Sequence, residues 1–257
     1  SRSLLEKLID NNVNVIYVYE NCDNASPDAV FPNNWFSTHN NNIIVLYPML
    51  AANRRKEKSD RLINYIKNTF QIKEIIDLSP FENENKFLEG TGSLVFDHKN
   101  KICFASISER TTSELSNNIN KKLGYKTTFL NYTDENDKPV YHTNVCMCIG
   151  NGFAIAAINN LKSKSERTAL FEYFEANKLE PVLISPKQVH SFCGNALQLQ
   201  TTTSRPLLAM SNTAEQIKTI EKHSDILHTE IGTIEKIGGG SVRCMLAEIF
   251  FQPAWQR

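Results

Sequence analysis

The sequence predicts an α/β fold built from a repeated module of strand, strand, helix and strand. Two observations predict it. Apolar residues alternate along the chain between the period of strands and the period of helices. The module also recurs about every fifty residues, a period typical of a propeller, a solenoid or an array. The 257 residues hold about five copies without a linker-like stretch between them, so we expect one domain over 1–257 with internal pseudo-symmetry.

The first copy is incomplete at its start. The chain opens at Ser1 in what reads as a helix, without an initiator methionine, so we expect an incomplete N-terminus. The elements that follow are a strand over 13–19, a strand over 43–47, a helix over 54–69 and a strand over 73–78. The helix places Leu62, Ile66 and Phe70 near one apolar face.

The next three copies are complete. The second has strands over 93–97 and 101–106, a helix over 111–123 and a strand over 127–130. The third has strands over 145–149 and 153–157 around the hairpin signal Gly150-Asn151-Gly152, a helix over 163–177 and a strand over 181–185. The fourth has strands over 196–200 and 206–210, a helix over 213–222 and a strand over 226–229. A last turn, Gly238-Gly239-Gly240, leads into the apolar segment 244–251.

Composition argues against several classes of protein. Lys and Arg number 28 and Asp and Glu number 28, so the formal charge is zero and no nucleic-acid partner is expected. No run approaches roughly 18 apolar residues, so no membrane-spanning helix is expected. The cysteines are too sparse for a disulfide scaffold and lack zinc-knuckle or redox spacing; they are Cys22, Cys103, Cys146, Cys148, Cys193 and Cys244. We expect a cytoplasmic protein. Its six histidines are scattered without ligand spacing, so neither a metal nor a cofactor is expected.

Four segments depart from the local apolar pattern and carry reactive side chains. They are Pro27-Asp28-Ala29-Val30-Phe31-Pro32-Asn33-Asn34-Trp35, Phe87-Leu88-Glu89-Gly90-Thr91-Gly92-Ser93, Tyr141-His142-Thr143-Asn144-Val145 and Gly238-Gly239-Gly240-Ser241-Val242-Arg243-Cys244. In a ring of repeats, such segments would converge at one end. In an extended chain, His142 and Asn144 point to the same side. Bare glycine N–H groups before Cys244 could stabilise a thiolate. Taken singly, each segment also fits a plain turn, a buried cysteine or a structural histidine.

Together and in this order, the four segments resemble the guanidino-group-modifying superfamily. Its members include arginine deiminases, dimethylarginine dimethylaminohydrolases and amidinotransferases, and the motifs look closest to the citrulline-utilisation hydrolases. The resemblance covers nearly the whole chain, from about residue 3 to 251. It implies a five-bladed α/β propeller with pseudo-fivefold symmetry, the pentein fold.

The resemblance implies a role for three residues. Cys244 is similar to the nucleophile that attacks the central carbon of a guanidino or ureido group and forms a covalent intermediate. His142 is similar to the general acid and base that protonates the leaving amine and later activates water. Glu89 is similar to the carboxylate that holds the substrate nitrogens.

Departures from the family pattern bear on the substrate. In arginine-processing relatives the loop equivalent to Phe31-Pro32-Asn33-Asn34 ends in an acid or in Glu-Asp, and the deiminases also carry an acid where this chain has Asn144. A guanidinium is a cation that presents only hydrogen-bond donors, so a buried site for it requires several carboxylates. A ureido group is neutral and has a carbonyl acceptor beside its N–H donors, which suits an amide. We therefore favour citrulline over arginine. Asp28 is a second nearby acid, and it could face a cation or the α-amine of the substrate.

An amino-acid substrate needs a cation for its α-carboxylate, usually an arginine. Arg110 resembles the carboxylate-binding position of the dimethylarginine hydrolases. Arg54-Arg55 also resembles a family motif, although an ion network at a helix start explains this pair at least as well. Arg205 and Arg243 are further candidates because they lie near motifs. Cys193 is assigned to structure.

The leading hypothesis is a cofactor-free hydrolase that converts citrulline to ornithine, carbon dioxide and ammonia, and either carbon–nitrogen bond could break first. One alternative is an activity of the arginine deiminase or dimethylarginine dimethylaminohydrolase type. A second is a non-catalytic propeller binding protein, similar to ribosome-associated factors that lack the cysteine. The expected partner is a small amino-acid substrate, with no nucleic acid and no membrane, and the sequence gives no indication of oligomeric state.

Overall fold

The computed structural model describes residues 2–18, 26–203, 205–214 and 218–251, and within them the strands form four sheets of three strands each. The first sheet contains β1 (Phe36–His39), β2 (Ile43–Leu46) and β3 (Glu74–Asp77). The others contain β4 (Leu94–Asp97), β5 (Ile102–Ser106) and β6 (Lys126–Leu130); β7 (Met147–Gly150), β8 (Phe153–Ala156) and β9 (Glu180–Leu183); and β10 (Leu197–Leu199), β11 (Leu207–Ser211) and β12 (Asp225–Thr229).

Each sheet has the same topology. Its first two strands form an antiparallel hairpin, and the middle strand then pairs in parallel with the third. In the second sheet, for example, Phe104 lies opposite Val95 on one side and Thr128 on the other. A parallel pair needs a crossover connection. In the second and third sheets α4 (Ser113–Lys122) and α5 (Lys164–Ala176) supply it, and in the first α2 (Asp60–Thr69) does. The predicted strand-strand-helix-strand module is confirmed in these copies.

Two predicted helices begin later than expected. Residues Arg54–Glu57 form a separate 3-10 turn, η3, and α2 begins after Ser59. The hydroxyl of Ser59 accepts a hydrogen bond from Leu62 N, so this serine caps the helix and fixes its start. In the fourth copy, the described part of 213–222 contains only the 3-10 turn η7 (Lys218–Lys222).

The strand predicted over 13–19 is wrong for residues 13–18, which form no strand, and Tyr19 lies outside the described residues. Val13 and Val15 instead pack beside α1 (Arg2–Asp10) against the fourth sheet. β1, α6 (Pro186–His190) and α7 (Gly232–Gly238) were not predicted.

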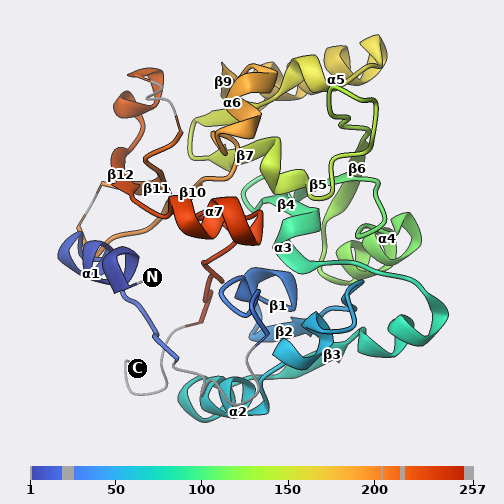
Figure 1. The fold of residues 1–257 in the computed structure, drawn as a ribbon, viewed down its shortest axis with the longest axis vertical. Helices are drawn as coiled ribbons and strands as arrows, with labels where there is room; N and C mark the ends of the chain where they lie inside the picture. Colours follow the sequence, from blue (N-terminus) through green and yellow to red (C-terminus); the bar gives the residue numbers. More distant parts are fainter. Residues whose placement is uncertain (1, 19–25, 204, 215–217, 252–257) are drawn as a thin grey trace.

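The two ends of the chain contact the first and last sheets. Leu4 and Leu8 of α1 pack with Leu207 and Leu227 of the fourth sheet. Near the other end, the Thr38 hydroxyl of β1 donates to Glu248 O at 2.8 Å and accepts from Phe250 N at 3.0 Å. Figure 1 shows the sheets following one another around a common centre, with α3 (Gly90–Ser93) and α7 near the middle.

A tight turn, here called a lead-in turn, precedes the hairpin of each sheet. In every one, the N–H of the fourth residue donates to the carbonyl of the first. The five turns of this form, given as first and fourth residues, are Phe31 and Asn34, Glu89 and Gly92, His142 and Val145, Phe192 and Asn195, and Ser241 and Cys244. The first four end two residues before β1, β4, β7 and β10. The backbone thus repeats one local structure five times, with different side chains on it.

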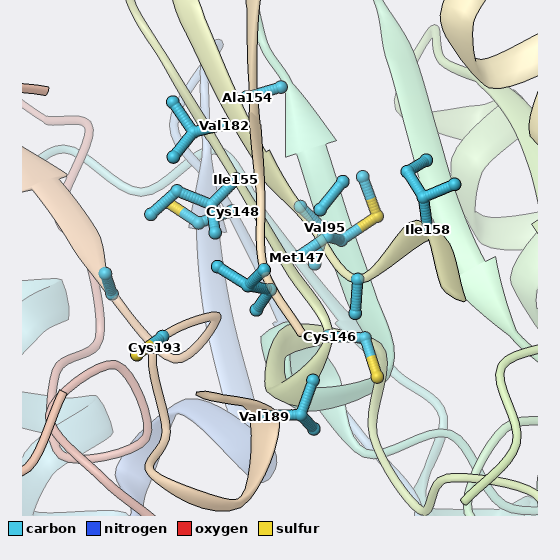
Figure 2. Close-up of a cluster of buried hydrophobic side chains, with 14 of the residues drawn as sticks. Val95, Cys146, Met147, Cys148, Ala154, Ile155, Ile158, Val182, Val189 and Cys193 are labelled. Carbon is cyan, nitrogen blue, oxygen red and sulfur yellow. The ribbon is translucent and has the colours of Figure 1, made fainter. Parts of the chain in front are cut away.

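The largest apolar cluster packs the second, third and fourth sheets together. Figure 2 shows Cys146, Cys148 and Cys193 in it, among aliphatic side chains such as Ile155 and Val189. Burial raises the pKa of Cys148 to about 12. These three thiols act as small buried hydrophobic groups. Among the helices of the described residues, none has the length and apolar character needed to cross a bilayer.

Candidate active site

The lead-in turns bring the predicted residues to one place. Glu89 and His142 are the first residues of the second and third turns, and Cys244 is the fourth residue of the fifth. Each turn touches the next. A Cβ on Gly90 would lie 2.2 Å from Asn33 O, and one on Gly240 would lie 2.8 Å from the Phe31 ring. Side chains that are far apart in the sequence therefore meet over the centre of the molecule.

Glu89 and His142 form a buried pair. His142 Nε2 lies 2.8 Å from Glu89 Oε2, and Glu89 Oε1 accepts from Leu50 N at 3.1 Å. Burial alone would raise the pKa of Glu89, but the His142 hydrogen bond and the nearby Arg110 charge outweigh it and lower this pKa to about 2. The carboxylate is therefore ionised at neutral pH.

His142 is neutral and has a defined tautomer. Burial lowers its pKa, although the hydrogen bond to Glu89 opposes this effect. Because an ionised carboxylate only accepts, the Nε2 atom carries the proton and Nδ1 keeps its lone pair. A Cβ on Gly92 would come within 2.8 Å of His142 Nδ1 and Cε1. Only a glycine fits against this ring.

The Cys244 thiol is buried and accepts from two amides. Asn144 Nδ2 lies 3.6 Å from Sγ and Asn195 Nδ2 lies 3.3 Å from it. Asn144 belongs to the 3-10 turn η5 (Thr143–Val145), and His142 immediately precedes that turn. Between these described residues no hydrogen bond joins His142 to Cys244 directly. The turn η5 connects the two groups along the backbone: His142, just before the turn, contacts Glu89, and Asn144, within the turn, contacts Cys244.

Two predictions about these segments are wrong in their local structure. His142 and Asn144 do not enter a strand, because Thr143–Val145 form the turn η5. The glycine segment does not supply the hydrogen bonds recorded at Cys244 Sγ, which come from side chains. Gly238 and Gly240 instead leave room for the Phe31 ring, and Gly239, at φ +66°, ends α7 in the left-handed region.

Arg54 fixes the orientation of the Asn34 amide. Arg54 is buried, forms a two-point ion pair with Glu57 and donates from Nη1 to Asn34 Oδ1 at 2.9 Å. An arginine has no acceptor, so Oδ1 must face it and Nδ2 must face away. Asn34 Nδ2 is buried without a partner, and a Cβ on Gly92 would lie 2.5 Å from it. The free donor of Asn34 therefore lies against the same glycine as the His142 ring.

Asn33 and Asp28 lie further from the chemistry. Asn33 Nδ2 donates to Thr91 Oγ1 at 3.2 Å, which ties the 3-10 turn η2 (Pro32–Asn34) to α3. Asp28 is half-buried; its carbonyl accepts from Arg54, and Oδ1 lies 3.9 Å from a Cβ built on Gly238. Asn33 thus joins two turns, and Asp28 lies at the edge of the glycine segment.

Arg110 pairs with Glu89 from a partly exposed position. Its Nη1 donates to Glu89 Oε2 at 3.0 Å, and its guanidinium lies 5.9 Å from the centre of the Tyr141 ring. About a third of its side chain is exposed. The other predicted cations are paired elsewhere. Arg55 is paired with Glu82, Arg205 with Asp225 and Arg243 with Glu248. For Arg54 and Arg55 the predicted ion network is what the structure contains.

Sequence reasoning missed the contacts that three residues make in this site. Asn195 contacts the thiol, Arg54 orients Asn34, and the Tyr141 hydroxyl donates to Gly239 O at 2.6 Å, joining the histidine and cysteine segments. A signal existed for Asn195. The pair Gly194-Asn195 precedes a strand at the same distance as the predicted Asn34 does.

A cavity of about 680 Å³ approaches the site from the hairpin turns at the other end of the sheets. Its lining includes Lys99, Asn151 and Arg243, and it reaches Asn144. Within the described part of the chain, no group of three His, Cys, Asp or Glu side chains is arranged to hold a metal ion.

The sequence and the fold both match known proteins. Residues 2–251 match the family described as N,N dimethylarginine dimethylhydrolase, eukaryotic. A comparison with curated proteins found no match. The N-terminal domain of ArgZ, covalently bound to a reaction intermediate, is 19% identical with a TM-score of 0.67 over 86% of this chain and 75% of that chain. ArgZ is an arginine dihydrolase from the ornithine-ammonia cycle in cyanobacteria.

Two further solved structures have a similar fold. A mutant of AgrE in complex with L-arginine is 17% identical with a TM-score of 0.73, over 95% of this chain but only 34% of AgrE. A dimethylarginine dimethylaminohydrolase in adduct with S-methyl-L-thiocitrulline is 14% identical with a TM-score of 0.58, over 85% of this chain and 76% of that chain. The chain belongs to the N,N dimethylarginine dimethylhydrolase family, within the guanidino-group-modifying superfamily of pentein proteins.

Proposed function

We propose that the protein is a cysteine-dependent hydrolase that converts citrulline to ornithine, carbon dioxide and ammonia. The observation that carries the proposal is the Asn34 amide, whose Oδ1 is held by Arg54 and whose Nδ2 is buried and free. This atom offers a donor where a carboxylate would offer an acceptor. A donor suits the carbonyl oxygen of a ureido group, and it has no partner on a guanidinium, which presents only donors.

The charge of the site supports a neutral reacting group. Glu89 is the buried carboxylate beside His142, and Arg110 already pairs with it at 3.0 Å. The Arg54 charge is balanced by Glu57. A bound guanidinium would therefore find both Glu89 and Glu57 already paired. An uncompensated buried charge costs several kcal/mol. A neutral ureido group avoids this cost.

The residues can be placed in one reaction. Cys244 Sγ attacks the ureido carbon, and the former carbonyl oxygen takes up negative charge next to the Asn34 N–H. His142 Nδ1 takes up the thiol proton as the sulfur attacks and gives it to the amine that leaves the tetrahedral species. Water, activated by the same imidazole, cleaves the carbon–sulfur bond and regenerates the thiol. The carbamate released then decomposes, so that citrulline and one water give ornithine, carbon dioxide and ammonia.

Similar folds support the covalent step. ArgZ has been crystallised covalently bound to a reaction intermediate and, as a cysteine-to-serine mutant, bound to substrate. The dimethylarginine dimethylaminohydrolase forms an adduct with a thiocitrulline derivative. The burial of Cys244, His142 and Glu89 around one point also argues against a non-catalytic binding protein, which has no use for this trio.

A second candidate function is hydrolysis of arginine or dimethylarginine, which the family description favours. The same nucleophile and imidazole could serve it. In that case Arg110 would leave Glu89 and bind the α-carboxylate, which would free Glu89 for the cation. Asp28 and Asn33 would then lie on the substrate side of the first turn. Cytoplasmic location remains our prediction for either activity.

Turnover of purified protein with citrulline, arginine and dimethylarginine distinguishes the candidates. We expect ornithine and ammonia in equal amounts from citrulline, with little ammonia from the other two. Ammonia from arginine but not from citrulline would overturn the substrate assignment. Asn34→Asp should reduce kcat/KM for citrulline by about 10²-fold, the effect of removing one oxyanion donor. Asn33→Asp is the matched control, because Asn33 is the neighbouring residue and its amide donates to Thr91 instead; it should change kcat/KM less.

We also propose that the fold closes as a five-bladed propeller. The five lead-in turns support this, because each contacts the next and the fifth contacts the first through Gly240 and Phe31. The contacts of α1 with the fourth sheet and of the C-terminal segment with the first sheet support a fifth blade formed by the two ends of the chain.

A further inference from the structure

The sulfur of Cys244 has an unusual set of neighbours. Its two hydrogen-bond donors are the neutral amides of Asn195 and Asn144, at 3.3 and 3.6 Å. Both asparagines are at most 1% exposed. In the described part of the chain, no Lys, Arg or His side chain forms a hydrogen bond or ion pair with this sulfur. Two amides, rather than a cation, face the nucleophile.

The orientation of the Asn195 amide is determined by its partners. Nδ2 donates both to Cys244 Sγ and to the carbonyl oxygen of Asn144, at 3.2 Å. Both partners are acceptors, so rotating the amide by half a turn would place Oδ1 against an oxygen and a sulfur. Gly194 holds the backbone close to the third turn, since a Cβ there would lie 2.4 Å from Val145 O. The N–H₂ group is therefore fixed toward the sulfur.

Asn195 also has the same place in its turn as two residues already assigned to the site. It is the fourth residue of the fourth lead-in turn, as Asn34 is of the first and Cys244 is of the fifth. The repeated backbone thus directs three fourth-position side chains toward one centre. The shared position in the turns is an observation independent of the hydrogen bonds at the Cys244 sulfur.

We propose that Asn195 is a catalytic residue that, together with Asn144, stabilises Cys244 as a thiolate and holds its sulfur for attack. A thiol that loses its proton to solvent becomes an anion, and an N–H donor binds an anion more strongly than a neutral acceptor. The two amides therefore favour the thiolate without placing a positive charge in the site. This inference rests on the proposed function only in taking Cys244 as the nucleophile.

Alkylation of Cys244 by iodoacetamide as a function of pH tests the inference, without any substrate. The rate is followed for each cysteine by peptide mass spectrometry in the wild type, Asn195→Ala and Asn195→Asp. Asp has the same shape but offers no donor, and its charge repels a thiolate. At neutral pH we expect the Cys244 rate to fall about tenfold in Asn195→Ala, the loss of one hydrogen bond to an anion, and further in Asn195→Asp. The whole rate–pH curve should move to higher pH.

Asn120→Ala is the matched control. Asn120 is also fully buried, donates through Nδ2 to Thr127 and has an Oδ1 without a partner; its side chain also hydrogen-bonds the Cys103 thiol, and it forms no hydrogen bond with Cys244. The rate–pH curve for alkylation of Cys244 in Asn120→Ala should coincide with that of the wild type. An unchanged curve in folded Asn195→Ala, or an equal shift in Asn120→Ala, would overturn the inference.

The experiment distinguishes a failure of this inference from a folding defect and from a failure of the proposed function. If Asn195→Asp does not fold, Asn195→Ser, which is smaller and keeps a donor, should show a rate between those of Asn195→Ala and the wild type. A Ser variant that reacts no faster than Asn195→Ala contradicts the role of the donor. If the proposed function fails, the wild type does not release ornithine from citrulline, whereas the alkylation profile still reports on Asn195.

Discussion

At the scale of single residues, the proposed function depends on Cys244. Cys244→Ser should lower kcat by about 10³-fold or more, because a serine hydroxyl without a dedicated base is a poor nucleophile. Steady-state release of ornithine measures this. Cys103→Ser, a fully buried thiol in β5, is the control and should retain kcat. A Cys244→Ser variant as active as this control would exclude covalent catalysis at Cys244.

Glu89 should make stability depend on pH. Despite its burial, contacts with His142 and Arg110 lower its pKa from 4.5 to about 2. Because the pKa is lower in the folded state, the ionised carboxylate stabilises the fold above about pH 4.5, and this stabilisation is lost as the pH falls toward 2. It is on the order of 3 kcal/mol.

In Glu89→Gln the free energy of unfolding should therefore fall less steeply over this acid range, as measured by denaturant titration at several pH values. The exposed Glu84→Gln is the control and should follow the wild type. Parallel curves for Glu89→Gln and the wild type would contradict the ionised, paired state of Glu89.

The residues that sequence alone could identify are those whose type is unusual in its segment. Glu89, His142 and Cys244 stand in polar or glycine-rich motifs within apolar surroundings, so they could be found. The contacts of Asn195 and Arg54 could not be found, because they join partners in other turns, at Cys244 Sγ and Asn34 Oδ1; for Asn195 the only signal was its place before a strand. No spacing along the chain encodes those contacts.

At the scale of elements, the second lead-in turn depends on Gly92. A Cβ at this position would lie 2.5 Å from Asn34 Nδ2 and 2.8 Å from His142 Cε1, so Gly92→Ala must displace the amide, the ring or both. We expect kcat/KM for citrulline to fall about 10²-fold, the effect of misplacing a reacting group by about an ångström. Gly232→Ala in α7, where a Cβ meets nothing within 4 Å, is the control. Equal activity of both variants would show that the turn tolerates a side chain.

The sequence pattern predicted strands and crossover helices better than turns. Strands such as β5 and β8 are short apolar runs that are buried along nearly their whole length, and such runs bounded by turn residues are a recognisable strand signal. The lead-in turns contain polar residues that other turns bury. A prediction from hydrophobic patterning assigns polar residues to the surface, so it cannot identify these turns. Residues 13–18 illustrate the opposite error: they are apolar in alternation because they pack beside α1, without forming a strand.

At the scale of the whole molecule, Thr38 joins the first sheet to the C-terminal segment. Its hydroxyl binds Glu248 O and Phe250 N, and Thr38→Val leaves both groups without this partner. Unfolding in urea should show a loss of about 1–3 kcal/mol. Thr38→Ser keeps the hydroxyl and should restore most of the stability. If Thr38→Val and Thr38→Ser unfold at the same urea concentration, the hydroxyl does not hold the segment.

The repeated arrangement explains why function and fold could be predicted together. The period of the modules places the four unusual segments at equivalent positions, and the structure puts all four in lead-in turns that meet at one centre. The number of described sheets, four, could not be read from the period, because the first and last parts of the chain form no strand between residues 2–18 or 244–251.

Acid quenching during turnover, followed by peptide mass spectrometry, tests the proposed chemistry most directly. With citrulline, the peptide that contains Cys244 should carry on its sulfur either a carbamoyl group or an ornithine attached through the former ureido carbonyl, absent from the other cysteine peptides and from Cys244→Ser. Turnover of citrulline with that peptide unmodified, or an adduct that forms with arginine and never with citrulline, would contradict attack of Cys244 on a ureido carbon.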